Sequence, residues 1–223
     1  MIEKIKQKMR IVYVPISNHF YKKFKAPKRY QALFDEIAMI KASSILEVGT
    51  WNGRRAIKMI NCAQENAVGK VRYIGFDLFE DLTQEMFKYE LSKMPPTQEG
   101  VTKLLEQTGA QVTLVKGNTL QTLPEFVRNS GQVDFIFIDG GHSVETIQSD
   151  WDAVSKLMHK ETVVIFDDYW RNRPDESAKP VVDAIDTDKY NVEVLPIVDK
   201  FNNPNFGRLE ISFAKVTLNK ESV

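Results

Sequence analysis

Short apolar runs alternate with stretches of helical periodicity along most of the chain from residue 43 onward. The runs predict buried strands over Ser43–Gly49, Val71–Asp77, Gln111–Lys116, Val133–Asp139 and Thr162–Asp168. Between them, apolar side chains recur on one helical face in Asn52–Glu65 and in Val144–Met158. Strands that alternate with helices are joined by right-handed crossovers, which place them parallel in one sheet. The pattern therefore predicts an α/β fold with a doubly wound, mostly parallel sheet and helices on both faces.

The end of the chain predicts two more strands. Asn191–Val198 and Leu209–Val216 are rich in β-forming residues and are separated by the turn sequence Asn-Asn-Pro-Asn-Phe-Gly. Because their connection is short, we expect them to pair antiparallel at one edge of a seven-stranded sheet. Two helical stretches, Asp81–Ser92 and Thr97–Gln107, lie between the second and third strands, where one crossover helix would suffice. The extra helix is a candidate lid or an additional cover for the sheet.

Basic residues concentrate near the N-terminus although the net charge is zero. Residues 1–30 contain nine lysines and arginines against one acid, Glu3. A basic arm interleaved with aromatic residues is able to bind RNA or an anionic surface. We favour a solvated flanking segment whose aromatic side chains pack on the domain, because no RNA-binding motif accompanies the charge. The predicted organisation is a basic arm and helix over residues 1–42, followed by one α/β domain over residues 43–223.

The cysteine content and the hydropathy of the N-terminal residues indicate the cellular compartment of the protein. Cys62 is the single cysteine, which excludes an intramolecular disulfide framework and a cysteine-based zinc cluster and fits a reducing environment. The apolar run Ile11–Ile16 is interrupted by Pro15 and is too short for a signal peptide or a membrane span. We therefore expect a soluble, cytoplasmic protein with no membrane partner.

A glycine-containing turn follows the first predicted strand. Residues 47–53 read Glu-Val-Gly-Thr-Trp-Asn-Gly. Glycines there let the backbone turn sharply and approach a ligand closely, although the same residues would also form an ordinary strand-to-helix turn. The segment lacks the glycine spacing of NAD enzymes and the lysine of a P-loop, and it resembles motif I of the class I S-adenosylmethionine-dependent methyltransferases. The resemblance implies a loop around the amino-acid end of the cofactor, with Glu47, Gly49, Thr50, Trp51 and Gly53 as cofactor-binding positions.

Polar residues also follow the second and third strands. Asp77 ends the second strand, where a carboxylate is able to accept both hydroxyl protons of a ribose, or to cap the next helix. Asn118 follows the third strand at the position where the methyltransferase family places a polar side chain near the adenine amino group, although Gly-Asn is also a common turn sequence. Both residues are therefore candidate cofactor contacts.

Three aspartates follow the fourth and fifth predicted strands. Asp139 ends the fourth strand, and Asp167 and Asp168 end the fifth. Adjacent parallel strands lie ~4.8 Å apart, so these carboxylates repel one another unless something positive lies between them. Oxygen ligands without cysteine suit Mg²⁺, Mn²⁺ or Ca²⁺. The alternative is that one aspartate caps a helix and the others are solvated.

The segments around these aspartates, Ile-Asp-Gly-Gly-His-Ser and Phe-Asp-Asp-Tyr, resemble the metal-dependent O-methyltransferases of the catechol and macrocin (sugar) branches. The resemblance implies that Asp139, Asp167 and Asp168 hold a divalent ion and that Asp139 also serves catalysis and cofactor binding. The catechol branch has a lysine as general base three residues after the first metal aspartate, and this chain has His142 there. Histidine is a suitable proton acceptor near neutral pH, but a histidine bonded to backbone is the alternative.

These features predict a methyltransferase that uses S-adenosylmethionine and a divalent ion to methylate a hydroxyl of a small molecule, such as a sugar or a catechol. One alternative is an RNA methyltransferase that uses the basic arm, although the N/D-P-P-Y/F signature is absent. Another is a non-catalytic partner protein in which lysine or arginine pairs with the aspartates. Related enzymes are often dimers, so a homodimer is also expected. We expect Trp151 in the core, and Tyr169 and Trp170 beside the acceptor.

Overall fold

The computed structural model of the chain describes residues 28–89, 94–203 and 206–219. Within these ranges an eight-stranded sheet has the order β3-β2-β1-β4-β5-β8-β6, with β7 paired to β8. The strands are β1 Ser44–Val48, β2 Arg72–Asp77, β3 Gln111–Lys116, β4 Phe135–Ile138, β5 Val163–Trp170, β6 Tyr190–Val194, β7 Asp199–Asn203 and β8 Gly207–Leu218. Strands β1 to β5 are parallel, whereas β8 is antiparallel to both β5 and β6. The predicted doubly wound fold and its antiparallel edge are confirmed.

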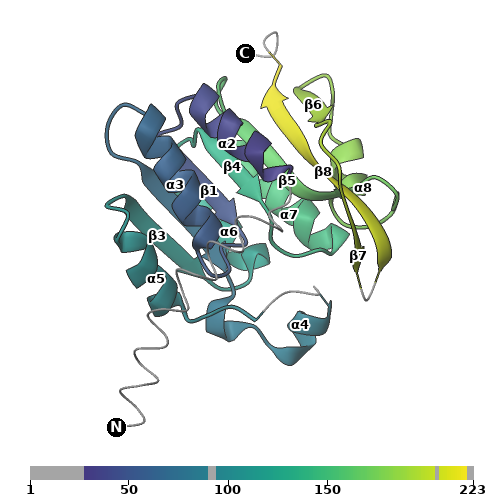
Figure 1. Ribbon diagram of the computed structural model, residues 1–223, viewed down its shortest axis with the longest axis horizontal. Helices are drawn as coiled ribbons and strands as arrows, with labels where there is room; N and C mark the ends of the chain where they lie inside the picture. Colours follow the sequence, from purple (N-terminus) through teal and green to yellow (C-terminus); the bar gives the residue numbers. More distant parts are fainter. Residues whose placement is uncertain (1–27, 90–93, 204–205, 220–223) are drawn as a thin grey trace.

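Strand β7 was not predicted. Its sequence, Asp-Lys-Phe-Asn-Asn, is polar and mostly exposed, so it lacks the apolar pattern of a buried strand. It forms because β8 extends beyond the rest of the sheet and pairs with it from Gly207 to Ile211. The β7–β8 hairpin therefore projects past the sheet (Figure 1).

Helices cover both faces of the sheet (Figure 1). Buried side chains of α2, α3 and α5 pack together on one face, and those of α6, α7 and α8 pack on the other. The helices are α2 Tyr30–Met39, α3 Arg54–Asn66, α4 Gln84–Tyr89, α5 Gln98–Glu106, α6 Thr119–Arg128, α7 Val144–Val154 and α8 Ala178–Asp183, with short 3₁₀ turns η1 Phe79–Asp81 and η2 Ser155–Leu157. Two helices were not predicted from the sequence: α6, which contains Pro124, and α8, which has six residues. Both depend on burial against the sheet more than on local periodicity.

The carboxyl ends of the parallel strands face α4 on one side and the β7–β8 hairpin on the other (Figure 1). Of the two helical stretches predicted between the second and third strands, the first, Asp81–Ser92, contains the end of η1 and the helix α4 in its described part. The turn after β1 contacts the segment that precedes α5, because the indole Nε1 of Trp51 donates to the Met94 carbonyl at 3.2 Å.

Helix α2 packs on α3 through the buried residues Leu33 and Ile37. The predicted boundary at residue 42 stays a prediction. Apart from Lys28, Arg29 and Tyr30, the basic arm lies outside the described residues. In the part of the chain that the structure describes, no helix has the length and apolar character of a membrane span.

Candidate active site

The turn after β1 depends on two glycines. Gly49 has φ +92°, and a Cβ on it would lie 2.1 Å from the Asp139 carbonyl oxygen. A side chain at this position would therefore push apart the residues that follow β1 and β4. Gly53 has φ +71° and is the residue from which α3 begins. Gly49 therefore brings the β1 turn into contact with the end of β4, whereas Gly53 lies against Val101 and Leu105 of α5.

Glu47 is buried beneath this turn. Its carboxylate accepts a hydrogen bond from the Tyr73 hydroxyl, which also lies 3.2 Å from the Thr50 hydroxyl oxygen. Burial raises the pKa of Glu47 to about 7, against a smaller lowering by the charge of Arg55 and by the Tyr73 hydrogen bond. Its other oxygen, Oε1, is buried and has no hydrogen-bond partner among the described residues. Thr50, predicted as a cofactor residue, is itself buried and supports Glu47 through Tyr73.

Asp77 joins the ends of β1 and β2. Its two oxygens accept from the backbone N–H of Trp51 at 2.6 Å and of Phe79 at 3.0 Å. Burial raises the pKa of Asp77, and these backbone hydrogen bonds oppose the rise. Trp51 has φ +46° and is 39% exposed, so its ring lies at the surface of the turn. Asn118 caps α6 by accepting from the Leu120 N–H at 3.0 Å.

The three predicted aspartates meet at the ends of β4 and β5. Ile138 pairs with Phe166, so Asp139 and Asp167 follow side by side. One carboxylate oxygen from each of Asp139, Asp167 and Asp168 lies within 4.8 Å of the others. The register of β5 against β8 shifts between Phe166 and Tyr169, and Asp168 has φ +53°. This local strain turns Asp168 toward the same place as its neighbours.

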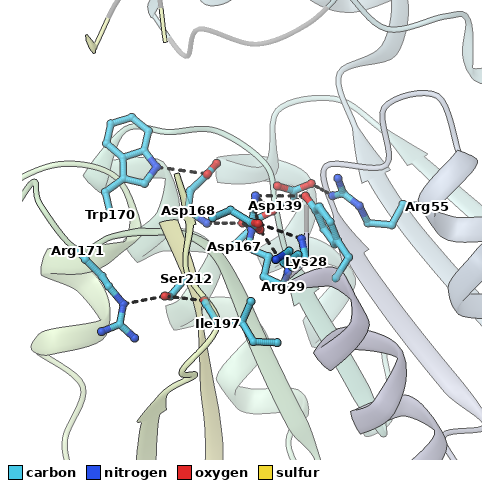
Figure 2. Close-up of polar contacts among 12 residues, drawn as sticks. Lys28, Arg29, Arg55, Asp139, Asp167, Asp168, Trp170, Arg171, Ile197 and Ser212 are labelled. Atoms are coloured by element: carbon cyan, nitrogen blue, oxygen red, sulfur yellow. Dashed lines mark hydrogen bonds and ion pairs between the residues drawn. The ribbon is translucent and has the colours of Figure 1, made fainter. Parts of the chain in front are cut away.

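Two arginines reach these carboxylates. Arg29, at the start of α2, donates from Nε to Asp167 Oδ1 at 2.8 Å and from Nη2 to Oδ2 at 3.2 Å. Arg55, in the first turn of α3, forms an ion pair with Asp139. Figure 2 shows Arg55 approaching Asp139 from one side of the cluster and Trp170 approaching Asp168 from the other. The positive charge among the aspartates is therefore supplied by the chain.

Asp167 is the most buried of the three aspartates, with 1% of its side chain exposed. Burial alone would raise its pKa, but the charges of Arg29 and Arg55 and the hydrogen bonds from Arg29 and Tyr30 hold it below the usual value. Arg29 is buried too, and its pKa is raised, because the attraction to Asp167 outweighs the effect of burial. The pair is therefore ionised in the folded protein near neutral pH.

The predicted divalent ion would have to bind among the oxygens of these three aspartates. The three aspartates, with Gly140, Gly141 and other neighbours, line a space of about 10 Å³, close to the volume of one water. All-oxygen ligands suit Mg²⁺, Mn²⁺ or Ca²⁺. However, Asp167 Oδ1 already accepts from Arg29 and from the Asp168 N–H, and Oδ2 accepts from Arg29 and from the Tyr30 hydroxyl. These four donors fill the lone-pair positions of the carboxylate, so the set of three aspartates does not fit a divalent ion as it stands.

His142 lies beside Asp168. The imidazole Nε2 is 3.0 Å from Asp168 Oδ2, and the two side chains are 28% and 21% exposed. The other Asp168 oxygen, Oδ1, accepts from the Trp170 indole at 3.3 Å. A histidine held by a carboxylate and open to the surface has the arrangement of a general base with its orienting group.

Trp151 was predicted in the core, and Tyr169 and Trp170 were predicted beside the acceptor. Trp151 is buried against Phe166 and Tyr190, which confirms its predicted place in the core. Tyr169 is buried and donates to Asp183, and Trp170 is 3% exposed. Trp170 therefore acts on the site through Asp168, and its ring is not a surface for an acceptor.

A larger cavity of about 880 Å³ lies at the amino ends of the strands, lined by residues such as Ile40, Val163 and Thr217. Doubly wound sheets bind ligands at the opposite, carboxyl ends. The cavity is lined by none of the candidate site residues, which are Glu47, Asp77, Asp139, His142, Asp167 and Asp168. The chemistry of these residues, rather than the size of a cavity, identifies the candidate site.

A family described as a methyltransferase domain matches residues 46–169, more than half of the chain. The chain belongs to this methyltransferase family. The matched segment begins within β1 and ends within β5, so it includes the glycine turn, Asp77 and all three aspartates.

Solved structures show the same fold at low identity. The O-methyltransferase TomG from Streptomyces achromogenes, in complex with SAM, has a TM-score of 0.58 and 16% identity over 89% of this chain and 86% of its own. The O-methyltransferase from Bacillus cereus, in complex with SAH, has a TM-score of 0.56 and 16% identity over 94% and 89%. CalS11, described as a TDP-rhamnose 3′-O-methyltransferase, has a TM-score of 0.54 and 16% identity over 82% and 75%. No curated protein matches the sequence.

Three residues that contact the aspartates were not predicted as site residues: Arg29, Tyr30 and Arg55. Arg55 follows the glycine turn by two residues, so its position in the first turn of a helix at the ligand edge was a usable signal. Arg29 was counted with a basic arm interpreted as solvated, yet it is 5% exposed. Nothing local distinguishes it from its basic neighbours.

Proposed function

We propose that this protein transfers a methyl group from S-adenosylmethionine to a hydroxyl oxygen of a small molecule. The observation that carries the proposal is the His142–Asp168 pair, 3.0 Å apart at the ligand edge of a methyltransferase fold. Several proteins of similar fold are described as O-methyltransferases, and two of them are complexes with SAM or SAH. These similarities support the choice of donor and of oxygen as the acceptor atom.

The residues after β1 and β2 fit such a donor. Glu47 offers a buried oxygen, Oε1, that has no hydrogen-bond partner among the described residues, and an ammonium group is a suitable donor for it. Gly49 lets the turn lie directly against the backbone of Asp139, which a side chain at this position would push away. Asp77 would accept ribose hydroxyls, because each of its oxygens has one described backbone donor and a further lone pair. When bound, the donor supplies an electrophilic methyl group on a sulfonium.

His142 would take the proton of the acceptor hydroxyl as the oxygen attacks the methyl carbon. The new bond joins oxygen to carbon, the carbon–sulfur bond breaks, and the proton remains on the imidazole. Asp168 stabilises the positive charge that the ring acquires and fixes the orientation of the ring. Asp139, paired with Arg55 and partly exposed, would contact the acceptor or the donor from the other side. General-base catalysis of this kind contributes ~10²–10⁴-fold to the rate.

This mechanism includes no step at a divalent ion, because Asp167 is filled by Arg29 and Tyr30. The predicted dependence on Mg²⁺ stays a prediction. Treatment with EDTA followed by readdition of Mg²⁺ or Mn²⁺ tests it directly, and the proposed mechanism expects full turnover in chelator. The RNA alternative depends on a basic arm that lies almost entirely outside the described residues.

The decisive experiment measures methyl transfer from isotopically labelled S-adenosylmethionine to a panel of hydroxylated sugars and catechols. Calorimetry measures SAH binding in parallel. We expect His142→Ala to lower turnover by ~10²–10⁴-fold and to leave the affinity for SAH unchanged. His159→Ala is the matched control, since His159 contacts Asp134 at the amino end of β4. A wild-type protein that binds neither SAM nor SAH would refute the proposal.

A further inference from the structure

Arg29 occupies the site in a way that no solvated arm residue would. Its side chain is 6% exposed, and two of its nitrogens face the two oxygens of Asp167. A two-pronged arginine–carboxylate contact is both strong and directional. A fixed positive charge therefore lies against the most buried aspartate of the cluster.

The surroundings hold Arg29 in this position. Asp199, at the start of β7, accepts from the backbone N–H groups of Lys28 at 2.9 Å and Arg29 at 3.2 Å, and from Arg29 Nη1 at 3.0 Å. The guanidinium carbon also lies 4.8 Å from the ring centre of Tyr30 and 5.4 Å from that of Phe213. The start of α2 and the β7–β8 hairpin thus fix the guanidinium jointly.

The same aspartates otherwise present the geometry of a cation site. Their oxygens lie within 4.8 Å of one another around a space of about 10 Å³. The obstacle is at Asp167, where Arg29 supplies two of the four donors that fill the carboxylate. Tyr30 adds a third donor at 2.7 Å.

We infer that Arg29 is a built-in counter-ion that takes the place of a divalent cation at Asp167. The strand-end aspartates then bind a divalent ion tightly only after the guanidinium is removed. The inference concerns the charge balance of the cluster and does not depend on the identity of the methyl acceptor.

The experiment uses Mn²⁺ alone as the probe. Binding is measured by electron paramagnetic resonance, and the melting temperature is recorded with and without Mn²⁺. Arg29→Met keeps the length of the side chain and removes its charge and donors. We expect roughly tenfold or more tighter Mn²⁺ binding in Arg29→Met than in the wild type, because removal of one partner leaves a buried, uncompensated carboxylate. Mn²⁺ should also raise the melting temperature of this variant and leave that of the wild type unchanged.

Two variants serve as controls. Arg29→Met combined with Asp167→Asn should lose the Mn²⁺ response, because the ligand charge is gone. Arg171→Met removes a nearby arginine that donates to Ser212 Oγ at 2.7 Å and to the Leu195 carbonyl at 2.9 Å. It should create no Mn²⁺ site.

Several outcomes would overturn the inference. They are tight Mn²⁺ binding by the wild type that Arg29→Met does not strengthen, or a folded Arg29→Met with no Mn²⁺ response. If Arg29→Met is unfolded without metal, recovery of its circular dichroism in Mn²⁺ supports the inference and failure to recover contradicts it. Tyr30→Phe opens one position on Asp167 and keeps Arg29, so Mn²⁺ binding by Tyr30→Phe would also count against it. Loss of methyl transfer in any variant bears on the proposed function and not on these readouts.

Discussion

The two halves of the ligand edge are built differently. At the ends of β1 and β2, backbone contacts hold the turn: Trp51 donates from its backbone to Asp77, 26 residues away, and Gly49 lets the chain pass close to the end of β4. At the ends of β4 and β5, the charge of Asp167 is balanced by Arg29, which is 138 residues distant. A half built from glycines and backbone amides can be recognised from spacing. The ion pairs that build the other half can be identified only in the folded structure.

The strongest test of the second half is Asp167→Ala. It leaves Arg29 buried without its main partner, so we expect the free energy of unfolding to fall by about 3–5 kcal/mol. Denaturant titration at pH 7 measures the change. Asp168→Ala, at a carboxylate with 21% of its side chain exposed, should cost clearly less. Equal losses in the two variants would show that the Arg29 pair is not the stabilising element.

The first half is tested by the pH dependence of Glu47. In the unfolded chain this carboxyl ionises near its ordinary pKa of 4.5, whereas burial raises the pKa to about 7 in the folded protein. Between these pH values the folded state keeps a proton that the unfolded state has released, so the free energy of unfolding falls as pH rises. Glu47→Gln should remove about 3 kcal/mol of this fall. Denaturant titrations at pH 4.5 and 8 compare the two proteins, and parallel curves would contradict the prediction.

Asp77→Asn probes the proposed donor site within the same half. Loss of the carboxylate weakens the hydrogen bonds to the Trp51 turn and those expected to ribose hydroxyls. Hydrogen bonds to charged groups contribute ~1.5–3 kcal/mol, so SAH affinity should fall by roughly 10–100-fold. Calorimetry measures the affinity. Asn118→Ala, which removes the cap of α6, is the comparison, and we expect it to affect SAH less.

The smallest change in the free energy of unfolding is expected at Lys28, the residue that precedes Arg29. Lys28 reaches Asp199 through its backbone N–H, and its side chain is exposed. Lys28→Ala should therefore change the free energy of unfolding by no more than about 0.5 kcal/mol. A large loss would mean that the whole arm, and not Arg29 in particular, stabilises the cluster.

Most of the fold was accessible from the sequence. The strands β1 to β5 were placed within one or two residues, because each carries an apolar run that ends in a polar or glycine residue at the ligand edge. Strand β7 and helix α6 were not, since the first is polar and the second contains Pro124. Strand β7 forms because it pairs with β8, and α6 forms because one of its faces is buried. Neither condition can be seen in the local periodicity of the sequence.

The candidate site divides in the same way. Asp139, Asp167 and Asp168 were expected to meet, because the ends of neighbouring parallel strands lie at one edge of the sheet. The sequence required a positive charge among them and left open whether a metal ion or a basic side chain supplies it, and it did not identify which basic residues are close enough. Arg55 comes from α3 and Arg29 from the start of α2, two of the helices that pack on one face of the sheet.

The amino-acid sequence alone determined the order of the five parallel strands, the glycine turn and the gathering of acidic side chains. All of these follow from periodicity and from the direction in which parallel strands run. Only the tertiary structure decided how the acidic charge is neutralised, that Asp168 faces His142, and that Thr50 and Trp170 support other residues. Such pairings join positions that are distant along the chain, and their energies depend on burial, which no local pattern of residues specifies.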